Sequence, residues 1–169
     1  MKKYLPFLSL LLFALLITSC AQKIISNKAE GYTKKPKKIF IESIYQGKGA
    51  EVSNGFAKEL SEQLLPYRIQ SMSYTHSNLS FDTDDDIYKK SDSYNAEAIM
   101  VIKQVYSTGN SGSGSFNIAL YDAQTKNPFW KSTFDIGMGD IYNDQSAITT
   151  AKAIIKKLIE DSVIDGPAK

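Results

Sequence analysis

Three aspartates at alternate positions are the most conspicuous group of potential ligands in the sequence. Asp82, Asp84 and Asp86 lie in the stretch DTDDD and match the first, third and fifth ligand positions of a calcium-binding loop. The match ends there, because Ile87 stands where the sharp turn needs glycine and Ser93 stands where the loop needs a bidentate glutamate. We therefore favour capping of a helix that begins near these carboxylates, with loose binding of a divalent cation as the alternative.

His76 is the single histidine of the chain, and a Ser-His-Asp arrangement would have to use it. No serine sits in the GxSxG pattern of a nucleophile elbow. One histidine also cannot supply the two that many catalytic zinc sites use. We predict a protein that is not an enzyme and holds no metal or cofactor. The alternative hypothesis is an envelope hydrolase or ligand-binding protein that uses His76 and the carboxylates of residues 82–86.

The glycines of STGNSGSG, residues 107–114, suggest a phosphate-binding loop only at first sight. Such a loop leads from a strand into a helix and ends in GK followed by serine or threonine. Here the segment joins two apolar stretches of strand character, and no lysine follows it. We predict that it connects two strands.

The start of the chain has the features of a secretory signal. Lys2 and Lys3 precede an apolar run, Leu5–Ile17, which is too short to cross a bilayer comfortably. The run ends in Ile17-Thr18-Ser19-Cys20, which resembles a bacterial lipobox. The resemblance implies transfer of a diacylglyceryl group to the sulfur of Cys20, cleavage before Cys20, and acylation of the new amine. We therefore predict a signal peptide over residues 1–19 and a membrane anchor at Cys20.

Charge and composition argue against some classes of partner. The chain has 20 basic and 18 acidic residues, and removal of Lys2 and Lys3 with the signal peptide would leave 18 of each. A neutral domain lacks the basic field of a nucleic-acid-binding protein, and Arg68 is the only arginine. With Cys20 as the only cysteine, the chain can form no internal disulfide and no thiolate zinc site.

The remaining sequence predicts one domain of the α/β (α+β) class. We expect a lipidated polar tether over residues 20–36, a domain over residues 37–165 and a tail over residues 166–169. Apolar periodicity predicts a single small mixed sheet in the order strand-helix-strand-helix-strand-strand-strand-helix, with helices packed on one face and a parallel pair around the first helix. The expected strands are 38–45, 69–75, 98–106, 116–122 and 129–136, and the expected helices are 50–65, about 84–95 and 145–164.

Three stretches of the domain carry a resemblance to known proteins. AEAIMVIKQV at 96–105, FNIALYDAQTKNPFWKSTFDI at 116–136 and the terminal helix follow one another as in the anticodon-binding-like α/β domains of bacterial envelope proteins. That group includes the lipoprotein activators of penicillin-binding proteins, the amino-terminal domain of TolB and the curli-secretion lipoprotein. The resemblance implies a non-catalytic module that binds another envelope protein.

Aromatic residues on the later strands are the candidate interaction surface. Phe129 and Trp130 are adjacent, so a regular strand would point them to opposite faces of the sheet. One of the two, together with Tyr121 and Tyr106, would then form an exposed aromatic patch, unless these side chains fill the core. Ala21 after the cysteine resembles lipoproteins sorted to an outer membrane. We therefore expect a lipid-anchored envelope protein on the periplasmic side of the outer membrane.

Overall fold

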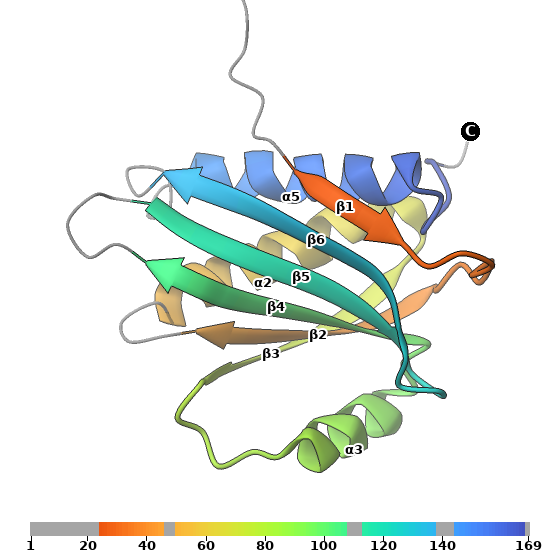
Figure 1. Ribbon diagram of the computed structural model, residues 1–169, viewed down its shortest axis with the longest axis horizontal. Coiled ribbons are helices and arrows are strands. Elements are labelled where there is room, and N and C mark those ends of the chain that lie inside the picture. Colours follow the sequence, from red (N-terminus) through yellow and green to blue (C-terminus); the bar gives the residue numbers. More distant parts are fainter. Residues whose placement is uncertain (1–23, 46–49, 108–112, 138–143, 168–169) are drawn as a thin grey trace, which may run out of the picture.

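The computed structural model describes residues 24–45, 50–107, 113–137 and 144–167, so the expected signal peptide and Cys20 lie outside the described residues. None of the helices in these ranges is long and apolar enough to cross a membrane. Six strands form one sheet with three helices around it (Figure 1). In chain order the elements are β1 (Ile25–Lys28), β2 (Lys38–Tyr45), α2 (Ala50–Leu64), the short 3-10 helix η1 (Leu65–Tyr67), β3 (Gln70–Ser77), α3 (Asp84–Tyr94), β4 (Ala98–Ser107), β5 (Ser113–Asp122), β6 (Pro128–Gly137) and α5 (Asp144–Glu160).

The sheet is mixed, as the sequence predicts, and its strand order is β1-β6-β5-β4-β2-β3. β2 pairs in parallel with both β3 and β4, which confirms the parallel pair around the first helix. β4, β5 and β6 form an antiparallel meander, as expected for consecutive strands joined by short turns. The α/β fold class is therefore confirmed.

α2 and α5 cover one face of the sheet, behind the strands in Figure 1. Phe56, Leu60 and Leu64 recur every four residues along α2 and are buried, which places them on one helix face. Ala151, Ile155 and Leu158, spaced by four and then three residues, form the buried face of α5. Their strand partners in this main core are Ile39, Ile41, Met100, Ile102, Phe116, Ile118, Leu120, Trp130 and Phe134.

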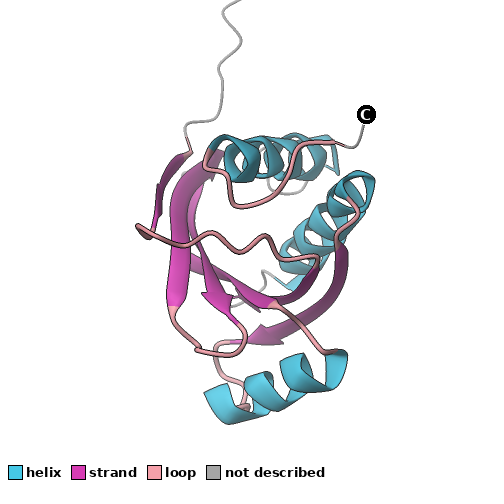
Figure 2. Ribbon diagram, turned by 90° about the vertical axis from the view of Figure 1, so that its right-hand side faces the viewer, coloured by secondary structure: helices cyan, strands magenta, loops and turns pink. Residues whose placement is uncertain are grey.

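α3 packs against the opposite face, so the prediction that the helices lie on one face is wrong for this helix. Its buried residue Ile87 meets Phe40 of β2 and Ile99 of β4, which alternate with the inward-facing residues of their strands. Figure 2 shows α3 on the other side of the twisted sheet from α2 and α5. Both faces of β2 and β4 are covered at this end, and their sequences are therefore apolar runs without alternation. Phe40 and Ile99 are the apolar residues on the α3 side.

The segment expected to be a tether differs most from the prediction. Residues 25–28 form β1 and pair antiparallel with β6, so that the sheet has an edge strand the sequence did not predict. After β1 the chain stays on the domain: Tyr32 stacks on Phe129 with ring centroids 3.8 Å apart, and Pro36 is buried. Backbone hydrogen bonds hold β1, and its sequence ISNK has no apolar pattern that would reveal them.

Two carboxylates hold this N-terminal segment. Asp122, 4% exposed at the β5–β6 turn, accepts from Lys34 Nζ at 2.6 Å, and its other oxygen accepts from the backbone N–H groups of Gln124 and Thr125. Burial alone would raise the pKa of Asp122, but the hydrogen bonds from Lys34 and the two backbone groups outweigh it and lower the pKa to about 2.

Asp161 joins three elements just after the last helix. Its Oδ2 accepts from Ser26 Oγ of β1 at 2.5 Å and from Trp130 Nε1 of β6 at 2.7 Å. Lys157 of α5 lies 3.2 Å from the other carboxylate oxygen. α5 ends at Glu160 rather than near Ile164, and this early end places Asp161 against β1 and β6.

Loss of the Asp122 carboxylate should release the N-terminal segment. We expect Asp122→Ala to lower the free energy of unfolding by about 2–3 kcal/mol, because the buried carboxylate accepts charged hydrogen bonds from Lys34 and from two backbone N–H groups of the turn, and all of them are lost. The matched control is Asp85→Ala, which removes an exposed carboxylate and should change stability by no more than about 0.5 kcal/mol. Urea unfolding of both variants measures the difference, and equal stabilities would contradict this role of Asp122.

The Asp122 carboxylate should also make the free energy of unfolding depend on pH. Because folding lowers the pKa of Asp122 to about 2, its contribution is present above its unfolded pKa of about 3.9 and is lost as pH falls through the folded value. We expect the stability gap between the wild type and Asp122→Asn to narrow from pH 4 towards pH 2. A gap that stays constant over this range would refute the assignment.

Candidate interaction surface

Phe129 and Trp130 do not form an exposed aromatic patch, which corrects the prediction from their adjacency. They are 3% and 1% exposed, and both belong to the main core beneath the helices. The register shifts at this point: Leu120 pairs with Trp130, whereas Tyr121 pairs with Pro128. Phe129 is therefore the extra residue of a bulge, and the bulge turns two consecutive side chains to the same side of the sheet.

The other two predicted residues have different positions. Tyr121 is half-buried and lies on the face away from α2 and α5, where it packs beside the second core cluster around Phe40. Tyr106 belongs to β4, but its side chain lies outside the described residues. Among the predicted aromatic residues whose side chains the structure describes, only Tyr121 lies on the open face of the sheet, where the exposed patch was expected.

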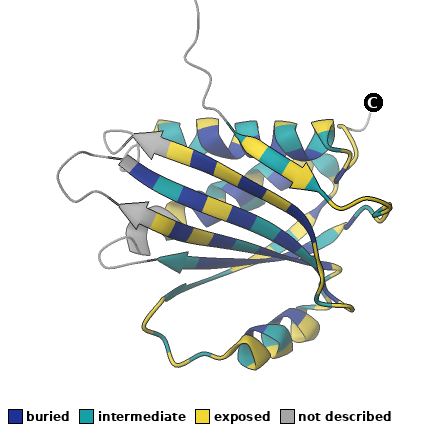
Figure 3. Ribbon diagram, in the orientation of Figure 1, coloured by how far each residue is buried: buried dark blue, intermediate teal, exposed yellow. Residues whose placement is uncertain are grey.

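A shallow depression crosses that face between β1 and β4. Its volume is about 480 Å³, and small or apolar side chains form its floor, with Val101, Ala119 and Tyr121 from β4 and β5 and Ile25 from the edge strand. Lys103 and Lys131 are exposed at its margin. Figure 3 shows buried and more exposed residues alternating along β4, β5 and β6, as expected for strands with one face covered by helices and the other open. Among the described residues, the helix on this face is α3, and it covers the end near Phe40.

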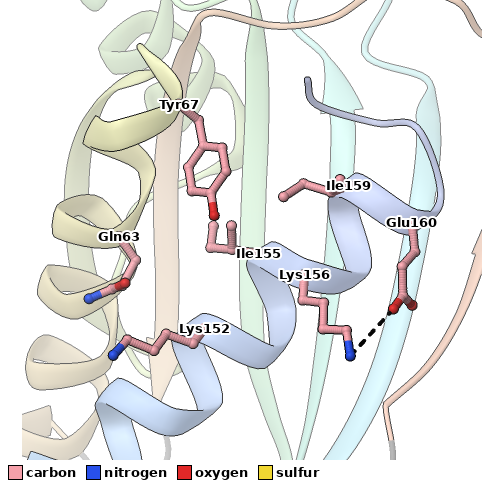
Figure 4. Close-up of a pocket in the computed structure, with 7 residues that line it drawn as sticks. All are labelled: Gln63, Tyr67, Lys152, Ile155, Lys156, Ile159 and Glu160. Carbon is pink, nitrogen blue, oxygen red and sulfur yellow. Dashed lines mark ion pairs between the residues drawn. The ribbon is translucent and has the colours of Figure 1, made fainter. Parts of the chain in front are cut away.

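A second groove lies between the two helices of the main layer. It has a volume of about 370 Å³, and Ile155 and Ile159 of α5 and Tyr67 of η1 form its apolar part. Lys152 and Lys156 project along its edge, and Lys156 lies 3.8 Å from Glu160 (Figure 4). Its rim is therefore cationic, with an acidic residue at one end only.

The loop between β3 and α3 displays two large apolar side chains that the sequence analysis did not single out. Leu79 is 83% exposed and Phe81 is 100% exposed. The signal was present in the sequence, because SNLSFD places both residues outside any periodic apolar pattern. Single exposed apolar residues are ordinary on a protein surface, but two on one short loop form a candidate contact site.

The aspartates of residues 82–86 have structural partners. Thr83 is the N-cap of α3, and it forms a capping box in which the Asp86 carboxylate accepts from the Thr83 backbone N–H at 3.0 Å. Asp82 accepts from Ser80 Oγ, Tyr74 OH and Lys90 Nζ. These hydrogen bonds, with that of Ser80 the strongest, lower the pKa of Asp82. The described residues contain no group of three or more His, Cys, Asp or Glu side chains placed to hold a metal ion.

His76 is paired with a residue that the sequence analysis did not consider. Its Nε2 lies 2.8 Å from Glu42 Oε1, and both side chains are largely buried between β2 and β3. Burial raises the pKa of Glu42, and the hydrogen bond and charge of His76 oppose that rise. No hydrogen bond or ion pair among the described residues joins His76 to the carboxylates of residues 82–86. The constellation of the alternative hypothesis is therefore not assembled by direct contacts.

The fold is shared with proteins of solved structure. The chain is similar to the PelC dodecamer from Paraburkholderia phytofirmans, with a TM-score of 0.54, 14% sequence identity, and coverage of 85% of this chain and 100% of that chain. Weaker likenesses are to TolB from Acinetobacter baumannii (TM-score 0.43, 13% identity, 82% of this chain and 31% of that chain) and to the C-terminal domain of LpoB from Salmonella enterica (0.45, 11%, 64% and 87%).

No protein-family model matches the sequence, and no curated protein sequence matches it either. The expected resemblance to envelope α/β domains is thus confirmed in part, as a similarity of fold. At these identities the function has to be argued from the residues of this chain.

The Glu42–His76 pair should be a coupled structural unit. We expect Glu42→Ala and His76→Ala each to lower the free energy of unfolding by about 2 kcal/mol, because each leaves a buried polar partner unpaired. The double variant should lose less free energy of unfolding than the two single variants added together, and the difference, the coupling energy, should be about 1 kcal/mol or more. Lys58 and Glu62, an exposed pair 3.8 Å apart on α2, are the control cycle and should couple by less than about 0.5 kcal/mol. Equal couplings in the two cycles would contradict the assignment.

Proposed function

We propose that this protein is a lipid-anchored envelope protein that acts without catalysis, as a module for protein–protein interaction and assembly. The observation that carries the proposal is the sheet face between β1 and β4, which holds an open depression of about 480 Å³ with an apolar floor and exposed lysines at its margin. An apolar patch with a polar margin on a folded domain is typical of a docking surface.

The position of β1 supports a close attachment to the membrane. If Cys20 carries lipid, only four residue steps separate it from Ile24, the first described residue, and they span at most about 14 Å. β1 is hydrogen-bonded into the sheet from Ile25 onward. The domain would therefore stand against the bilayer, on its periplasmic side and at the outer membrane if the sorting resemblance of Ala21 holds.

The likeness to PelC supports assembly as the activity. PelC was solved as a dodecamer, and its whole chain is covered by the match. A shared fold does not transfer an oligomeric state, but it supports testing this chain for self-association. The partner that we propose in general terms is an envelope protein, which includes a second copy of this chain, and nucleic acid is not among the expected partners.

The anchor is tested by fatty-acid labelling of the full chain in cells. We expect palmitate to label the wild type and to fall to background in Cys20→Ala, which should also leave the membrane fraction. Ser19→Ala, which keeps a small residue beside the cysteine, is the matched control and should retain the label. A wild type that is unlabelled and soluble would refute the membrane anchor.

The docking face is tested by crosslinking in intact cells. We expect Ala119→Glu to remove the crosslinks of the full chain to its protein neighbours, because it places a charge on the floor of the depression. Lys152→Glu, at the groove between α2 and α5, is the control and should leave them in place, provided that both variants unfold at the wild-type temperature. Crosslinks that survive in both variants, or that never form in the wild type, would argue against an assembly role through this face.

A further inference from the structure

We infer that copies of this protein associate head to tail, with the Leu79–Phe81 loop of one copy seated in the depression of the next. This inference rests on the proposed assembly function and names its partner as a second copy of the chain. It concerns two surfaces of one protomer, the loop between β3 and α3 and the face between β1 and β4.

The loop is already ordered for contact. Ser80 Oγ donates to Asp82 at 2.6 Å, and the backbone N–H groups of Leu79 and Ser80 donate to Ser77 at 3.1 and 2.9 Å. Polar groups therefore fix the backbone of the loop while Leu79 and Phe81 point into solvent. A contact made by a loop that is fixed beforehand loses little conformational entropy on docking.

The depression has the size and lining for one aromatic anchor. At about 480 Å³ it lies at the small end of the range of sites that enclose compact groups. Val101 and Ala119 offer an apolar floor, and the ring of Tyr121 stands beside them. Buried aromatic anchors of this kind supply most of the binding free energy in many interfaces.

The two surfaces are complementary in charge. Asp84 and Asp85 follow Phe81 closely and are exposed at the start of α3. Lys103 and Lys131 are exposed at the depression. Docking of Phe81 would bring the acidic start of α3 towards these lysines, which favours this orientation over one that pairs like surfaces.

The two surfaces do not meet within one protomer. The depression spans β1, β6, β5 and β4, and its margin at β4 lies two strand spacings, about 10 Å, from β3. Phe81 does not enter it in its own domain, because its side chain is fully exposed, and the proposed contact is therefore between copies. Because the surfaces differ, the contact is heterologous and repeats into a ring or a filament.

A lipid surface is the competing occupant of the loop. The exposed carboxylates of Asp84 and Asp85 beside Phe81 disfavour it, since bacterial membrane surfaces carry anionic headgroups that repel them. The loop also lies at the sheet edge remote from β1, whereas the expected anchor at Cys20 precedes β1. Both observations favour a protein contact.

The test uses two differently tagged copies of the full chain in one cell. One copy carries Phe81→Cys and the other Ala119→Cys, and a mild oxidant is added to intact cells. We expect a disulfide-linked species with both tags, at least about tenfold above the level with Phe81→Cys on both copies, because docking holds the unlike thiols at high effective concentration. Phe81→Cys paired with Lys152→Cys is the matched control and should stay at background.

A second variant measures the same contact without new thiols. Phe81→Asp in the full chain should shift the detergent-solubilised protein to the monomer, whereas Leu65→Asp, at a 61% exposed leucine elsewhere, should not. The inference is overturned if two Phe81→Cys copies form a disulfide-linked species in the same amount as the mixed pair. It is also overturned if Phe81→Asp leaves the size of the detergent-solubilised protein unchanged. It is also overturned if Phe81→Asp leaves self-association intact but weakens binding to phosphatidylethanolamine–phosphatidylglycerol vesicles. Palmitate labelling and crosslinks to other proteins would survive each of these failures and would leave the proposed function standing.

Discussion

The rest of the structure depends on the attachment of residues 25–36 to the domain. β1 adds a strand to β6, Asp161 ties Ser26 to Trp130, and Asp122 ties Lys34 to the β5–β6 turn. Asp122 is buried and Asp161 is partly buried, and each carboxylate serves several donors, so the segment and the turn stabilise one another. The segment expected to be a linker is therefore part of the sheet from Ile25 onward. The start of β1 sets how much chain separates Cys20 from the domain.

This attachment also decides how the surfaces are presented. If Cys20 carries the lipid proposed above, β1 begins within about 14 Å of it, while β3 and its loop lie at the other edge of the sheet. The depression begins at Ile25, on the strand that carries the attachment.

The sequence predicted the elements whose stability comes from apolar periodicity and missed those set by pairing. β2 and α2 follow their expected bounds closely, because the apolar run of β2 and the four-residue repeat of α2 are visible in single segments. The bulge at Phe129 and the partnership of Glu42 with His76 depend on register between strands, and Glu42 and His76 are 34 positions apart. Alternate residues of a strand share a face, so the sequence of β2 places Glu42 on the same face as Phe40. The register of β3 against β2, which brings His76 to Glu42, could not be known without the structure.

The bulge changes what kind of interface the domain can make. By turning both Phe129 and Trp130 into the main core, it adds their area to the stability of the fold and leaves an open face of Ala119, Tyr121 and lysine side chains. That face is apolar enough to receive a group, and Ile25, 55% exposed, lies at its edge. The most exposed large apolar side chain of the described residues is Phe81, on a loop held by its own hydrogen bonds. The receiving face and the inserting side chain are thus parts of one sheet domain that do not meet in a single copy, and the proposed contact brings them together between two copies.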